Sequence, residues 1–203
     1  KGVRKSFGRV VALAGADVTA YSGEVHGVVG ENGAGKTTLM NVLAGMVRPQ
    51  GGEVLVDSDP VRFSKPRDAW GRGIGMVHQH FTLVPPLSVL ENVALGVRTG
   101  GHGLRLPYPR IRRKLDDLRL LTGFAVRDDV RVEDLSAGER QRVEILKLLV
   151  RDPDVLIFDE PTAVLAPQEV TELIRVFRRL AADGRTVFVI AHKLDEVLDA
   201  GDR

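Results

Sequence analysis

The chain contains no cysteine, and aromatic residues make up only 5% of its 203 residues. The lack of cysteine excludes disulfide bonds and thiol catalysis, and it fits a reducing compartment. No apolar run reaches the roughly eighteen residues that a membrane-spanning helix needs. No signal-peptide pattern opens the chain either. These absences predict a soluble globular protein without disulfides or membrane spans.

The sequence also lacks a strong charge of either sign. Its net charge is +2, and no acidic or basic block marks a nucleic-acid-binding arm, so we expect no nucleic-acid partner. The length fits one domain, or one domain with a subdomain. The chain begins at Lys1 rather than Met and ends at Arg203 just after a helical pattern. We therefore expect a piece of a longer protein, shortened at both ends.

The most informative stretch is a glycine-rich loop with a lysine and two threonines. A short apolar strand at residues 25–29 leads into it, and a helix at residues 37–44 follows. Two of its glycines have four residues between them and precede Lys and Thr, which is the phosphate-binding pattern. The stretch consists of Gly30, Glu31, Asn32, Gly33, Ala34, Gly35, Lys36, Thr37 and Thr38.

Each residue type in this loop suits phosphate binding. Glycines let successive backbone N–H groups face one anion, and the helix N-terminus adds positive charge. Lys36 can reach the outer phosphates, and the Thr37 hydroxyl can bind Mg²⁺. The alternative is a glycine-rich strand–helix turn without a ligand, but such a turn has no need of a Lys-Thr pair.

A second motif lies at residues 155–160, where four apolar residues precede the two acids Asp159 and Glu160. The apolar run predicts a central parallel strand buried on both faces. Open α/β sheets bind ligands at the carboxyl ends of such strands. Asp159 suits Mg²⁺, directly or through water, and Glu160 can polarise an attacking water. An acidic turn after a strand is the alternative.

Three further positions are ambiguous by themselves. Phe7 can stack on a nucleotide base or belong to the core. Ser136, with Gly138 after it at a helix start, can form a second anion site or act as an ordinary N-cap. His192 ends the last expected strand, at residues 185–191, and can contact a phosphate or be structural.

Two histidines flank Gln79, but no Cys or third His accompanies them at ligand spacing, so we do not expect a metal centre there. The composition becomes helix-rich at residues 83–150, which predicts a subdomain inserted into the core. Residues 1–82 and 151–203 then form the two parts of a nucleotide-binding core.

Taken together, these motifs resemble those of the ATP-binding cassette (ABC) ATPases, and the resemblance covers essentially the whole chain. It rests on the family's order and spacing of the phosphate loop, Gln79, the segment Leu135 to Glu139, the acidic strand end and His192. The segment 135–139 is the specific signal, because kinases and GTPases lack it.

The resemblance implies a P-loop NTPase fold: a mostly parallel sheet core, antiparallel strands at one side and an inserted helical subdomain. It implies that Phe7 stacks on adenine, that Glu160 is the catalytic carboxylate and that His192 is the switch histidine. Gln79 would sense Mg²⁺ and the γ-phosphate, beside Thr37 and Asp159. Two cassettes of this family enclose two ATPs, so Ser136, Gly138 and Glu139 would contact ATP held on the opposite cassette.

Residues 76–81, 84–93 and 161–169 look like those of the first cassette of tandem ATPases serving nucleoside or simple-sugar importers. This implies ATP hydrolysis with Mg²⁺ at the cytoplasmic face of the membrane. The implied partners are a second cassette, transmembrane permease subunits and, indirectly, a solute-binding protein. Three positions depart from the family pattern: Ala137 replaces Gly, Glu139 replaces Gln and Ala166 replaces Asp. These departures raise the prospect of asymmetric ATP sites.

Other functions fit less well. A soluble ABC protein acting on ribosomes or DNA usually has basic linkers or long coiled-coil insertions, which residues 83–150 lack. A small-molecule kinase has no use for residues 135–139. A nucleotide-gated binding module without turnover predicts loss of the carboxylate, yet Glu160 is present.

Overall fold

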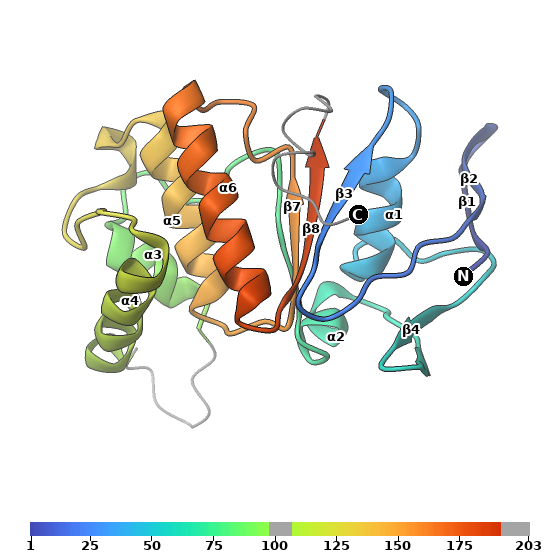
Figure 1. Ribbon diagram of the computed structural model, residues 1–203, viewed down its shortest axis with the longest axis horizontal. Coiled ribbons are helices and arrows are strands. Elements are labelled where there is room, and N and C mark those ends of the chain that lie inside the picture. The colour runs from blue at the N-terminus through green and yellow to red at the C-terminus, as the bar shows by residue number, and fades with distance from the viewer. Residues whose placement is uncertain (98–106, 192–203) are drawn as a thin grey trace.

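A four-stranded parallel sheet forms the centre of the computed structural model, which describes residues 1–97 and 107–191. The strands lie in the order β3 (Val25–Val29), β8 (Thr186–Ala191), β7 (Val155–Asp159) and β6 (Ile74–Val77). The expected central strand at residues 155–159 is confirmed, since β7 pairs with β8 on one side and β6 on the other. All four strands therefore place their carboxyl ends at one edge of the sheet (Figure 1).

Both faces of this sheet are buried, which explains why β7 is apolar throughout instead of alternating. Its residues Leu156 and Phe158 belong to one core cluster, whereas Ile157 belongs to another. β8 divides in the same way, with Val187 and Val189 on one face. Successive side chains of a strand point to opposite faces, so each strand contributes to both clusters.

Helices cover the two faces. One face carries α3 (Val89–Leu95), α4 (Tyr108–Thr122), α5 (Ala137–Leu149) and α6 (Pro167–Ala182), as Figure 1 shows. Buried residues at helical spacing fix these helices in place; in α4 they include Ile111, Leu115 and Leu118. The other face carries α1 (Lys36–Leu43), whose buried Met40 and Val42 lie in the second cluster. The described residues also form two short helices, α2 (Pro66–Trp70) and a 3₁₀ helix (Val132–Asp134).

Two antiparallel pairs flank the side that carries α1 (Figure 1). They are β1 (Val3–Phe7) with β2 (Val10–Ala16), and β4 (Val54–Val56) with β5 (Asp59–Val61). The expected combination of a parallel core with antiparallel strands at one side is confirmed. In the described part of the chain, no helix combines the length and the apolar character that crossing a bilayer requires.

Candidate functional site

The glycine-rich loop joins β3 to α1 in a conformation that requires glycine. Gly33 and Gly35 both adopt left-handed backbone angles, with φ of 82° and 88°. A β-carbon on Gly35 would lie 2.5 Å from the carbonyl oxygen of Ala12 and 2.9 Å from Leu13 Cδ2. Gly35 is therefore fixed both by its φ angle and by the close approach of β2.

Lys36 begins α1, and its ammonium lies within the same loop. Its Nζ donates to the carbonyl oxygens of Gly30 at 2.6 Å and Glu31 at 3.0 Å. Helix geometry leaves the first backbone N–H groups of α1 without acceptors in the helix, and its first turn contains no acid. The loop thus places an ammonium and a helix N-terminus together, an arrangement suited to polyphosphate.

The loop is joined to the acidic end of β7. The Thr37 hydroxyl donates to Asp159 Oδ1 over 3.2 Å, although 122 residues separate the two in sequence. Asp159 is 3% exposed, and burial raises the pKa of its carboxyl above the usual value. The hydrogen bond from Thr37 and the nearby charges of His78 and Lys36 oppose that shift.

These oxygens fit a magnesium ion. Mg²⁺ typically takes one or two carboxylates, with water and substrate phosphates supplying its other ligands. Within residues 1–97 and 107–191, no group of three or more His, Cys, Asp or Glu side chains gathers at metal-binding distance. A hydroxyl and a carboxylate beside a phosphate loop nevertheless match the magnesium pattern, which does not depend on such a cluster.

Glu160 is brought together with Gln79. Gln79 follows β6, and its Nε2 donates to Glu160 Oε2 over 2.7 Å. Glu160 adopts a left-handed backbone angle, φ 49°, which is unusual for a residue with a side chain, and its N–H donates to the carbonyl oxygen of Ile190 at 3.0 Å. Strained backbone at the end of a central strand is a common feature of functional sites.

Phe7 does not belong to the core. It ends β1 and is 51% exposed, and Lys5 Nζ lies 5.2 Å from the centre of its ring. The β1–β2 hairpin that carries it also contacts the phosphate loop, through Ala12 and Leu13 against Gly35. Of the two interpretations that the sequence left open, the exposure of the ring disfavours a core role, and base stacking stays a prediction.

Ser136 is the N-cap of α5, the helix on the opposite face of the sheet from α1 (Figure 1). Its backbone N–H and hydroxyl donate to Glu139 Oε2 at 2.9 and 2.8 Å, and its hydroxyl accepts from the Glu139 N–H. These backbone and side-chain hydrogen bonds lower the pKa of the Glu139 carboxyl. Because α5 and α1 cover opposite faces of the sheet, the segment 135–139 is not brought to the phosphate loop of its own chain.

His192 lies outside the residues that the structure describes. Sequence reasoning missed Thr82, Glu144 and Lys147, which form a polar contact three residues after Gln79, with Glu144 buried and Thr82 exposed. One signal was available: Glu144 and Lys147 are the only charged residues in the otherwise apolar stretch 143–150.

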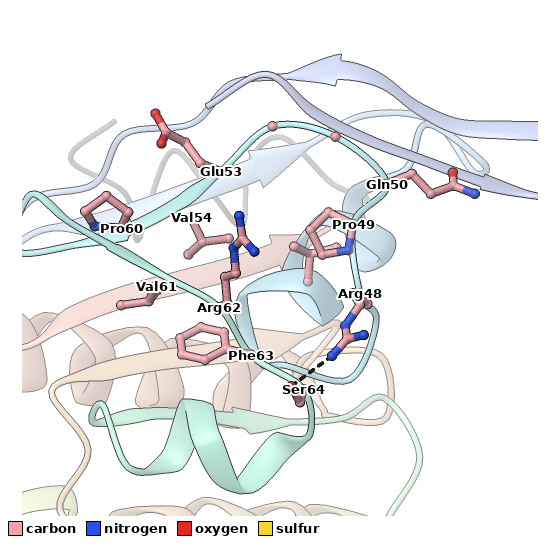
Figure 2. Close-up of a pocket in the computed structure, with 13 residues that line it drawn as sticks. Arg48, Pro49, Gln50, Glu53, Val54, Pro60, Val61, Arg62, Phe63 and Ser64 are labelled. Carbon is pink, nitrogen blue, oxygen red and sulfur yellow. Dashed lines mark hydrogen bonds between the residues drawn. The ribbon is translucent and has the colours of Figure 1, made fainter.

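A separate cavity of about 480 Å³ lies between α1 and the β4–β5 pair (Figure 2). Arg48 and Arg62 line it, and Arg48 Nη2 donates to Ser64 Oγ over 2.9 Å. None of the residues expected from the sequence to bind nucleotide lines this cavity. It is therefore distinct from the phosphate-loop site.

Comparison with known protein families identifies the chain. The family model described as ABC transporter matches residues 13–163. This chain belongs to the ABC transporter family. The ABC cassette fold is matched by a solved nucleotide-free ATP-binding cassette from an ABC transporter, with a TM-score of 0.88, 27% identity, and coverage of 100% of this chain and 83% of that one. A dimeric bacterial ABC transporter cassette, MJ0796, matches with a TM-score of 0.81 and 26% identity over 98% of this chain and 90% of that one.

Curated relatives of this ABC cassette are import ATP-binding proteins. The nucleoside import ATP-binding protein NupA of Lactococcus lactis is 45% identical over 99% of this chain and 40% of its own length. The guanosine import ATP-binding protein NupO of Bacillus subtilis is 42% identical over 91% of this chain and 36% of its own. The ribose import ATP-binding protein RbsA of Chelativorans is 41% identical over 100% of this chain and 39% of its own. The chain thus spans about two fifths of the length of these relatives.

Proposed function

We propose that this chain is the ATP-binding and ATP-hydrolysing cassette of an ABC importer for nucleosides or simple sugars. The observation that carries the proposal is the hydrogen bond between Thr37 and Asp159. It joins the phosphate loop to the acidic strand end, where Glu160 follows and is held by Gln79. Phosphate-binding and water-activating groups therefore lie at one edge of the sheet.

Lys36 and the loop N–H groups bind the triphosphate in this proposal. The Lys36 ammonium exchanges its hydrogen bonds to the carbonyl oxygens of Gly30 and Glu31 for hydrogen bonds to phosphate oxygens. The new hydrogen bonds are stronger because the phosphate oxygens are charged. The other members of the loop, from Asn32 to Thr38, surround the phosphates, and Phe7 stacks on adenine. Thr37 and Asp159 would hold Mg²⁺, with Gln79 beside them, and the ion would neutralise phosphate charge.

Glu160 acts on the attacking water. Its carboxylate accepts a proton as the water oxygen bonds to the γ-phosphorus, while the bond from that phosphorus to the β–γ bridging oxygen breaks and ADP leaves. Gln79 helps to orient the water. The hydrogen bond from Gln79 Nε2 supports this pairing, because it places the amide within 2.7 Å of the carboxylate. His192 joins Glu160 and Gln79 in this proposal as the family's switch histidine, a role that stays a prediction.

A second cassette completes each ATP site in this proposal. Ser136 lies on a helix that covers the opposite face of the sheet from α1, which supports the expectation that Ser136, Gly138 and Glu139 contact nucleotide held by another cassette. The hydrogen bonds from Ser136 favour the charged form of Glu139, which would repel a γ-phosphate. Together with Ala137 and Ala166, this charge supports unequal ATP sites.

The import proteins among the relatives support the remaining partners. We expect the cassette to work at the cytoplasmic face of the membrane with permease subunits and, indirectly, a solute-binding protein. The division into residues 1–82, 83–150 and 151–203 stays a prediction, with the middle part as the helical subdomain that contacts the permease.

The Glu160→Gln variant tests the proposal. Gln keeps the shape of the side chain and can still accept from Gln79, but it is a much weaker base, so ATP hydrolysis should fall more than about tenfold. ATP affinity measured by calorimetry should stay unchanged. Glu53→Gln, the same change at an exposed glutamate of another part of the fold, serves as the control. Undiminished turnover in Glu160→Gln would contradict the role assigned to Glu160.

The Lys36→Ala variant tests the phosphate loop, and this change should abolish nucleotide binding.

A further inference from the structure

Thr82, three residues after Gln79, is held by two charged side chains of α5. Its hydroxyl donates to Glu144 Oε1 over 2.9 Å, and its backbone N–H donates to the same oxygen. Lys147 Nζ donates to the Thr82 hydroxyl oxygen at 2.9 Å and to the Thr82 carbonyl oxygen at 3.2 Å. Lys147 also pairs with Glu144 Oε2 at 3.4 Å. Every polar group of Thr82 is therefore bound to α5.

The two charged partners of Thr82 are largely buried. The Glu144 side chain is only 7% exposed and that of Lys147 20% exposed, so the carboxylate in particular is largely removed from water. Such burial is unfavourable unless the charges are well paired. Thr82 itself is exposed, so the contact adds little apolar packing. What the charged pair fixes is the backbone of a loop.

That loop leads directly to Glu160. It leaves the sheet after Val77 at the end of β6 and carries Gln79, whose amide holds Glu160 Oε2 at 2.7 Å. Held at Val77 by the sheet and at Thr82 by α5, the segment between has little freedom to shift. Because Ser136 caps α5, this chain of contacts runs from the helix that follows Ser136 to the acidic end of β7.

We propose that Glu144 and Lys147 are positioning residues that set the place of Gln79 relative to Glu160 by anchoring Thr82; this inference rests on the proposed ATPase function. A shift of α5 moves Thr82, and with it the amide that contacts the catalytic carboxylate. The groups act through Gln79 and do not touch the nucleotide.

Thr82→Val is the sharpest test, because replacing the buried Glu144 with Ala would endanger folding. Val has the shape of Thr but lacks the hydroxyl, and the residue is exposed. We expect kcat for ATP hydrolysis, measured on the full natural protein, to fall about threefold or more while KM for ATP stays within about twofold. Thr82→Ser should restore kcat. Thr171→Val, the same change at an exposed position of α6, should leave kcat unchanged.

A double-mutant cycle with Gln79→Ala separates positioning from general stabilisation. If Thr82 acts through Gln79, Thr82→Val should have no further effect on kcat once Gln79 is replaced. An equal loss in both backgrounds would overturn the inference, as would a kcat of Thr82→Val equal to that of the wild type.

The same experiment distinguishes failure of this inference from failure of the proposed function. Hydrolysis that falls more than about tenfold in Glu160→Gln but is unchanged in Thr82→Val would overturn the positioning role alone. A wild-type protein without ATP hydrolysis would overturn the proposed function, and the positioning role with it.

Discussion

Gly138 and Glu169 are in contact, so closely that a β-carbon on Gly138 would lie 2.3 Å from Glu169 Oε1. The Glu169 carboxylate also accepts the N–H of Ala166 at 3.0 Å and lies 3.4 Å from Arg142 Nη2. It thereby joins the first turn of α6 to the first turn of α5. A side chain at position 138 would therefore have to displace this carboxylate, independently of any contact with nucleotide on a second cassette.

We predict that the effect of Gly138→Ala on stability changes sign with Glu169. In the wild type the new methyl group displaces the carboxylate that accepts the Ala166 N–H, and the loss of this charged hydrogen bond should lower the free energy of unfolding by about 1 kcal/mol net. In a Glu169→Ala background the clash is absent, and Ala should stabilise the helix relative to Gly by roughly 0.5 kcal/mol or more. Urea unfolding of the four proteins measures both effects. Equal changes in the two backgrounds would show that the contact carries no energy.

Phe7→Ala should weaken binding of ATP while sparing inorganic triphosphate. Stacking of a base on an aromatic ring contributes about 1–3 kcal/mol, so we expect the Kd for ATP to rise about tenfold. Inorganic triphosphate has no base, and its Kd should stay within about twofold. Because the ring is 51% exposed, the fold should not suffer. Calorimetry on Phe7→Ala, with Phe7→Tyr as the variant that keeps a ring, measures this. Equal losses for both ligands would exclude stacking.

The capping contact of α5 should make stability depend on pH. Hydrogen bonds from the backbone N–H and hydroxyl of Ser136 lower the pKa of Glu139 below its ordinary value of 4.5. A carboxyl with a lowered folded-state pKa stabilises the protein fully above its ordinary pKa, and this stabilisation is lost as the pH falls through the folded-state value. The wild type should therefore lose stability relative to Glu139→Gln between about pH 6 and pH 3.

Thermal melting of the two proteins across this range tests the prediction. Glu91 forms the same contact with Ser88 at the start of α3. Because Glu91 is present in both proteins, its effect on the melting temperature cancels in the difference between them. A difference in melting temperature that does not change with pH would show that the Glu139 carboxylate contributes nothing as a charge.

Much of the fold was predictable because its causes are local. The strand at residues 155–159 follows from an uninterrupted apolar run, and α6 follows from apolar residues at helical spacing after Pro167. The conformation of the phosphate loop follows from its glycines, of which Gly35 tolerates no side chain. The resemblance to ABC ATPases supplied the antiparallel strands at one side, which no local pattern assigned.

The candidate site was predictable as a set of residues but only partly as an arrangement. Asp159 and Glu160 were expected at a strand end, yet their partners Thr37 and Gln79 are 122 and 81 residues away in the sequence. Which strands become neighbours decides these pairings. Whether Phe7 is buried depends equally on what packs against the β1–β2 hairpin.

The sequence by itself determined the elements, the phosphate loop and the identity of the residues around it, because helix periodicity, strand burial and glycine conformations are set by near neighbours in the chain. Only the tertiary structure decided that Thr82 is held by Glu144 and Lys147, and that Gly138 faces Glu169. Such contacts join segments far apart in sequence, and they exist only after the strand order and the packing of the helices bring those segments together.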